Sequence, residues 1–318
     1  MKSHSNGLWV VLLLGLSLPL AAERLHLVIP AGPGGGLDAT ARALGNTLTD
    51  SQLLQGVSYE NRTGGGGGKA MAYCVNSGAS LDDTLLVNSA PLIVRSLQGL
   101  FPHSYRDLTP IGGLIADPGV IAVRANSPLS SWGDVVAALG DSRKRLFVGG
   151  GSVKGSLDHI TLSLLAQADG IDPRKIRYLA YDGGAKALLA LMSGEVDVLV
   201  SGLGETLAAH QAGTIRILGV TADSGHQTAG ITSFRDQNVD VVFYNWRGVF
   251  APGDIEPTDK KRLVELLTEA VATPTWQQQL DRYGWQPKFL PDQLFVEYLQ
   301  EQERQLQEIM TDLGLVRR

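Results

Sequence analysis

Residues 25–45 read LHLVIPAGPGGGLDATARALG: a short apolar run, a glycine-rich turn, and an Ala/Leu-rich segment that begins near Asp38. Glycines let the backbone turn tightly and approach a ligand closely. A helix that begins after such a turn directs unpaired N–H groups and the positive end of its dipole back at the loop, which favours an anion. The stretch therefore predicts a strand, a turn and a helix with an anion site at the turn, and it leaves open which anion binds there.

Short apolar and β-branched runs recur along the chain and alternate with helical patterns. Strands are expected at residues 25–30, 56–62, 84–89, 120–125, 145–151, 176–181, 196–202, 215–222 and 241–251. Helical patterns cover 160–170, 185–194 and much of the region after Pro257. Such alternation is typical of parallel sheets with helices on both faces, so the predicted fold class is α/β.

The length of the chain suits two lobes rather than one domain. No Pro/Ser-rich linker separates them, so the chain is expected to cross between the lobes twice. Residues 124–132 and 245–254 are the candidate crossings, because each joins a strand to a proline-marked turn. Lobe 1 is therefore expected at residues 23–124 plus 246–318, and lobe 2 at 125–245.

The N-terminal residues have the layout of a secretory signal peptide. Lys2 precedes the apolar run LWVVLLLGLSLPL at residues 8–20, and Ala21-Ala22 follow. The run is shorter than the roughly 20 residues that a membrane-spanning helix needs. We expect residues 1–22 to be removed near Ala22 and the mature protein to be exported; a retained anchor is the alternative.

Charge and cysteine content exclude several classes of function. The formal charge is −5, and loss of residues 1–22, which contain one lysine and no acid, makes it −6. A mildly acidic surface argues against nucleic acid. Cys74 is the only cysteine and the six histidines are not at metal-ligand spacing, so we expect no disulfide, no metal and no cofactor.

The glycine-rich runs do not fit the nucleotide-binding motifs. In NRTGGGGGKA (61–70), Ala70 stands where a P-loop needs Ser or Thr, and the run at 32–36 lacks the third glycine of the dinucleotide fingerprint. Neither G-x-S-x-G nor H-E-x-x-H occurs. The sequence therefore favours a binding protein over an enzyme.

Polar turns follow several of the predicted strands. In open α/β sheets, ligands bind beyond the carboxyl ends of strands, where these turns supply N–H groups and hydroxyls. The candidate ligand-binding residues are Gly34, Gly35, Gly36, Asp38, Asn88, Ser89, Ser152, Gly155, Ser156, Asp158, Tyr181, Gly183, Gly184 and Ser201. Each also has a structural interpretation: Asp38 and Asp158 suit helix N-caps, and Tyr181 could fill a core. Lys154 is a nearby cation whose role stays open.

Five segments resemble the tripartite tricarboxylate transporter substrate-binding proteins, the TctC or Bug family of extracytoplasmic solute receptors. They are PAGPGGGLDATARAL (30–44), YENRTGGGGGKAMAY (59–73), GGGSVKGSLDH (149–159), YLAYDGGAKALLALMSGEVDVLVSG (178–202) and NWRGVFAP (245–252). The resemblance covers nearly the whole mature chain, in the right order. It implies a periplasmic-binding-protein fold of the second type, a periplasmic location, a carboxylate in the interlobe cleft, and delivery to a permease of one large and one small subunit. Gly36 and Leu37 look closer to the tricarboxylate-binding branch, so a citrate-like ligand is expected.

The glycine-rich loops contain no arginine, which leads us to expect that backbone amides supply most of the carboxylate recognition. Two other functions stay open from the sequence. One is an exported enzyme acting on carboxylic acids with Asp38 or Asp158 as base, and the other is a ligand-sensing subunit for a membrane signalling protein. A monomer is expected.

Overall fold

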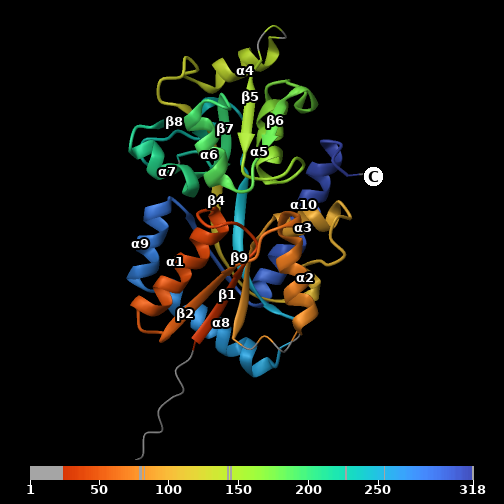
Figure 1. The fold of residues 1–318 in the computed structure, drawn as a ribbon, viewed down its shortest axis with the longest axis vertical. Coiled ribbons are helices and arrows are strands. Elements are labelled where there is room, and N and C mark those ends of the chain that lie inside the picture. The colour runs from red at the N-terminus through yellow and green to blue at the C-terminus, as the bar shows by residue number, and fades with distance from the viewer. Residues whose placement is uncertain are drawn as a thin grey trace, which may run out of the picture.

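The computed structural model describes residues 24–78, 81, 83–141, 143, 145–225, 228–253 and 255–316. The predicted signal peptide lies outside these residues. Within the described part of the chain, no helix combines the length and apolar character needed to cross a bilayer. The chain forms two lobes, one above the other, joined by long strands (Figure 1).

Lobe 1 is built on a mixed sheet. β1 (Arg24–Ile29) lies between β2 (Gly56–Asn61) and β3 (Thr84–Ser89) and is parallel to both. β9 (Tyr244–Pro252) then pairs antiparallel with β3 and with β4 (Leu108–Arg124), and β10 (Gln286–Pro291) adds to β4. The expected parallel pairing is present between β1, β2 and β3, whereas β9 returns from lobe 2 and enters the sheet in the opposite direction.

Lobe 2 is built on a second sheet around the other end of β4. β7 (Val198–Gly202) and β8 (Ile215–Val220) both pair antiparallel with β4. β5 (Phe147–Gly150) lies between β7 and β6 (Arg177–Ala180) and is parallel to both. The βαβ part predicted from alternation is therefore present, with β4 and β8 as an antiparallel addition.

Helices cover both faces of each sheet (Figure 1). Lobe 1 carries α1 (Gly36–Asp50), α2 (Gly68–Ser77), α3 (Pro91–Leu97), α8 (Pro257–Val271), α9 (Pro274–Tyr283) and α10 (Gln293–Asp312). Lobe 2 carries α4 (Trp132–Gly140), α5 (Leu157–Ala168), α6 (Gly184–Ser193) and α7 (Leu203–Gln211). Short 3-10 turns occur at Gly65–Gly67, Tyr105–Asp107, Pro173–Lys175 and Arg235–Gln237.

Four hydrophobic clusters fill the spaces between sheets and helices. In lobe 1, one cluster lies under α1, α8 and α9, and another lies under α2, α3 and α10. Phe295 of α10 is fully buried there, with its ring centroid 5.6 Å from that of Trp246. Leu157 and Ile160 of α5 join the same cluster, so lobe 2 packs directly on lobe 1.

The connection between the lobes is a pair of strands. Along β4, Pro118 is the last residue that pairs with β9, opposite Tyr244, and Gly119 is the first that pairs with β7, opposite Gly202. We therefore propose that the lobe boundary in β4 lies between Pro118 and Gly119; the boundaries expected at residues 124 and 245 stay predictions. Thr221 reinforces the junction, since its hydroxyl accepts from the N–H of Gly119 at 2.8 Å.

Candidate ligand-binding cleft

A cavity lies between the lobes where α1 of lobe 1 and α5 and α6 of lobe 2 begin. Its outer part has a volume of about 350 Å³ and its inner part about 110 Å³. The two parts share lining residues from both lobes, namely Ala31, Leu37, Pro91, Gly151, Ser152 and Gly183. This size and position are typical of sites for small molecules.

Ten of the fourteen predicted site residues line this cavity. The outer part is lined by Asn88, Ser152, Ser156, Tyr181 and Gly183, and the inner part by Gly35, Gly36, Ser89, Ser152, Asp158, Gly183 and Gly184. The structure does not place Gly34, Asp38, Gly155 or Ser201 in the lining of either part. Whether any of them contacts a ligand remains a prediction.

Asp38 holds the loop before α1 in place through the hydrogen bonds of its side chain. Its carboxylate is buried and accepts hydrogen bonds from the N–H of Gly34, from Arg42 Nε and from Asn61 Nδ2, each at 2.9 Å. Burial works against the charged form, but the hydrogen bonds from Arg42, Gly34 and Asn61 outweigh it and lower the pKa of Asp38. A carboxylate held in this way is poorly placed to act as a base.

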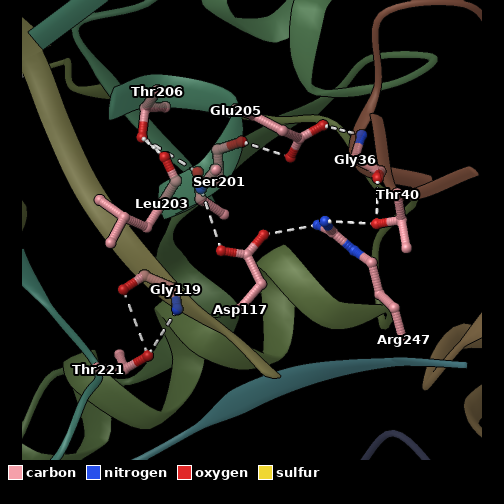
Figure 2. A network of polar contacts seen from close by, with 12 residues as sticks. Gly36, Thr40, Asp117, Gly119, Ser201, Leu203, Glu205, Thr206, Thr221 and Arg247 are labelled. Carbon is pink, nitrogen blue, oxygen red and sulfur yellow. Dashed lines mark hydrogen bonds and ion pairs between the residues drawn. The ribbon is translucent and has the colours of Figure 1, made fainter. Parts of the chain in front are cut away.

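Glu205 links the two lobes inside the cavity. It lies on α7 of lobe 2, and its Oε1 accepts from the N–H of Gly36, the first residue of α1 in lobe 1, at 2.7 Å (Figure 2). The hydroxyl of Ser201 donates to Oε2 at 3.0 Å. A Cβ at Gly184 would lie 2.4 Å from Oε1, so the start of α6 must be glycine to let this carboxylate approach. A carboxylate thus already occupies the N-terminus of α1.

A buried ion pair between Asp117 of β4 and Arg247 of β9 lies beside this contact. Arg247 Nη2 lies 2.6 Å from Asp117 Oδ2, and both side chains are almost completely buried. Arg247 Nη1 donates to Thr40 Oγ1 at 3.2 Å, and the N–H of Gly204 donates to Asp117 Oδ1 at 3.1 Å (Figure 2). The pair therefore joins both crossing strands to α1 and α7, and it compensates the charge of Arg247, the cation among the described residues that line the inner cavity.

Asp158 lies at the start of α5 and faces the inner cavity. Burial, and to a smaller extent the charge of Glu205, raise its pKa to about 7, while hydrogen bonds from Ser152 and Gly151 oppose this shift. Its own N–H donates to Ser152 Oγ at 2.9 Å. The inner cavity therefore carries one carboxylate, Glu205, and a second, Asp158, whose charge changes near neutral pH.

Arg95 is the cation of the outer cavity. It lies in the last turn of α3, and its Nη1 donates to Gln98 Oε1 at 3.3 Å. Its Nε is buried and has no hydrogen-bond partner among the described residues. The side chain packs against Gly66, where a Cβ would lie 3.3 Å from Nε.

Reasoning from the sequence missed Arg95, Glu205 and Arg247. It searched the glycine-rich loops and found no arginine there, whereas all three side chains reach the cavity from neighbouring helices or strands. Arg247 stands inside the quoted NWRGVFAP motif, which could have pointed to it. Arg95 and Glu205 carry no such signal. Among the residues that the structure describes, no group of His, Cys, Asp and Glu is arranged to hold a metal ion.

Comparison with known proteins gives one consistent result. The model of the family described as "Tripartite tricarboxylate transporter family receptor" matches residues 40–315. Protein BugT of Bordetella pertussis is 27% identical over 290 residues, which cover 88% of this chain and 87% of BugT. The structure of MatC from Rhodopseudomonas palustris with bound malate has a TM-score of 0.79 at 19% identity, covering 92% of this chain and 99% of MatC. The structure of an adipate-bound R. palustris protein has a TM-score of 0.82 at 20% identity, and the match covers 92% of this chain and 97% of that protein. The two structures share the two-lobed fold of periplasmic binding proteins with this chain.

Proposed function

Because the chain belongs to the tripartite tricarboxylate transporter family of receptors, we propose that its cleft captures a di- or tricarboxylate and delivers it to the large and small subunits of a membrane permease. The signal peptide would direct export of the receptor to the periplasm, where it would bind the acid for uptake into the cell. The expected ligand is citrate-like. Closure of the lobes would be stabilised by ligand contacts to both of them.

One observation carries the carboxylate assignment. Helices α1, α5 and α6 begin at a single interlobe cavity, and the N–H of Gly36 at the start of α1 donates to a carboxylate there, that of Glu205, at 2.7 Å. Helix N-termini favour anions because their N–H groups are unpaired and their dipoles are aligned. Hydrogen bonds to a charged acceptor are stronger than neutral ones. A ligand carboxylate that displaces Glu205, or that binds beside it, meets the same donors.

The relatives support the class of ligand without fixing its identity. MatC holds malate and the second R. palustris protein holds adipate, both dicarboxylates. The identities with this chain are only 19% and 20%, so the ligands of these two proteins do not fix which acid this cleft takes. The length and the substituents of the acid therefore have to be measured.

The test is a thermal-shift screen of residues 23–318 against mono-, di- and tricarboxylates, amino acids and nucleotides, followed by calorimetric titration of each compound that raises the melting temperature. A ligand at 100 times its dissociation constant adds about 2.7 kcal/mol to stability. We expect a selective response to di- or tricarboxylates. A response confined to nucleotides or other solutes would refute the proposal.

The alternative function, an enzyme acting on carboxylic acids, can be tested directly. The raised pKa of Asp158 favours testing it, because a base that titrates near neutral pH suits proton abstraction. The acid that binds best is incubated with the protein and followed by proton NMR. A receptor returns it unchanged, and any conversion would favour catalysis. Co-purification with permease subunits or with a membrane kinase, with and without the acid, separates uptake from sensing.

A further inference from the structure

We infer that Arg95 binds a second carboxylate of the ligand, so that the cleft selects di- and tricarboxylates over monocarboxylates. This inference rests on the proposed function. It assigns to Arg95 the recognition of the second carboxylate of the acid. It also gives a role to the glycine run at residues 64–68, which does not fit a nucleotide-binding motif.

The charges that line the cleft lead to Arg95. In the inner part, Glu205 and Asp158 are acidic, and Arg247, the cation among the described lining residues, is paired with Asp117. In the outer part, Asp182 lies 3.2 Å from Lys186 Nζ. No ion pair joins Arg95 to an acidic side chain among the described residues, and its side-chain hydrogen bond is to Gln98. Of the described residues that line the cavity, Arg95 is therefore the cation without an acidic partner, and a small polyanion gains its direct Coulomb attraction there.

The guanidinium also has unused hydrogen-bonding capacity. Arginine has five N–H donors in a planar fork that fits a carboxylate with two parallel bonds. In Arg95, Nη1 has one long bond to Gln98 and the buried Nε has no partner among the described residues. Nε is buried against Gly66, so a ligand carboxylate would pair with the Nη donors of the fork and gain free energy of binding there.

The glycine run makes the space for this side chain. Gly64, Gly65, Gly66 and Gly67 all have positive φ, at 117°, 63°, 63° and 96°. Side chains other than glycine rarely adopt this conformation, so the run is able to fold into a wall of the outer cavity. Arg95 lies against Gly66, and its Cζ is 5.7 Å from the centroid of the Phe101 ring. These contacts hold the guanidinium at the cavity rather than in solvent.

Gln98 couples Arg95 to lobe 2. Its Oε1 accepts from Arg95 Nη1, and its Nε2 donates to the carbonyl oxygen of Gly155 in lobe 2 at 3.0 Å. The orientation of the guanidinium is therefore linked to the position of lobe 2 relative to lobe 1. A diacid whose first carboxylate lies at the start of α1 and whose second reaches Arg95 would span the cavity and stabilise closure at both ends.

The experiment is a titration of wild-type protein and Arg95→Gln with malate, adipate and citrate, and with the singly amidated form of each acid. We expect Arg95→Gln to weaken binding of the preferred acid by about 10- to 100-fold, the range for hydrogen bonds to charged groups. The amidated form should bind the wild type with a similar loss, and Arg95→Gln should lower its affinity no further. Arg143→Gln, which removes an exposed arginine paired with Asp141, is the matched control and should bind like the wild type.

Each outcome separates the two proposals. If the wild type binds none of these acids, nor any other di- or tricarboxylate in the screen, the proposed function fails. If the wild type binds an acid and its amide equally well, or if Arg95→Gln binds the acid like the wild type, the function stands and the role of Arg95 is refuted. An equal loss for the acid and its amide would also refute it. Melting temperatures without ligand verify that the variant is folded, and the comparison of acid and amide on the wild type needs no variant.

Discussion

Asp158 should make the stability of the protein depend on pH in a window where most carboxylates contribute nothing. Burial and the nearby Glu205 raise its pKa from 3.8 to about 7 in the folded protein. Between about pH 4 and pH 7 the folded state therefore holds one proton more than the unfolded state, and the free energy of unfolding falls as the pH rises. The stabilisation is complete below pH 4 and is lost as the pH passes through 7. One proton corresponds to at most about 1.4 kcal/mol per pH unit.

The measurement is urea unfolding of the wild type and Asp158→Asn at intervals from pH 4.5 to pH 8.5. Asparagine stays neutral, so the wild type should lose stability relative to this variant as the pH rises, with an inflection near 7. Glu205→Gln should move that inflection to lower pH, because the charge of Glu205 is the second cause of the shift. The control is Asp172→Asn, whose carboxylate is paired with Arg174 and has a lowered pKa, so it should leave this window unchanged. Curves for wild type and Asp158→Asn that stay parallel throughout would refute the reasoning.

Three further predictions concern the contacts between the lobes. Gly184→Ala would place a Cβ 2.4 Å from Glu205 Oε1, so it should break the hydrogen bond between Gly36 and Glu205. Calorimetry should then show weaker carboxylate binding. Gly56→Ala, with open space around the added Cβ, is the control and should bind the acid like the wild type. Glu205→Gln should loosen the closed state without ligand, seen as a larger radius of gyration in X-ray scattering; an unchanged radius would mean that this bond does not hold the lobes together. Thr221→Val leaves the buried N–H of Gly119 without its acceptor and should cost about 1–3 kcal/mol in urea unfolding, while the exposed Thr268→Val should cost far less.

The sequence predicted the strands of the regular βα units and also β8 and β9, but it did not reveal that β4, β8, β9 and β10 pair antiparallel. The run at 25–45 forms β1, the loop and α1 as expected, although α1 begins at Gly36 rather than at Asp38. Residues 108–119, most of the 17-residue β4, and the whole of β10 were missed. Both contain prolines and the former contains several glycines, residues that argue against a strand, and both show irregular registers that accommodate them.

The sequence predicted which loops form the candidate site, but it did not predict the charged side chains that reach the site from helices. Turns after strands can be read from local pattern, and most of the residues proposed in them line the cavity. Arg95 and Glu205 lie on helices, where a charged residue usually faces solvent. Only the packing of α3 against the glycine run, and of α7 against the start of α1, turns them toward the cleft. Such contacts join residues more than 25 positions apart, which no local pattern reveals.

The strand β4 also decides how this protein can be divided. Its last six residues lie between β7 and β8 in lobe 2, while the preceding ones lie between β9 and β10 in lobe 1. A fragment cut on either side of β4 would therefore leave one sheet without an inner strand and with the two strands that flank β4 unpaired on that side. The lobes cannot be exchanged between homologues as independent cassettes. A recombination event that preserves folding has to carry β4 together with the strands of both sheets, so new ligand specificity is expected to arise by substitution within the cleft.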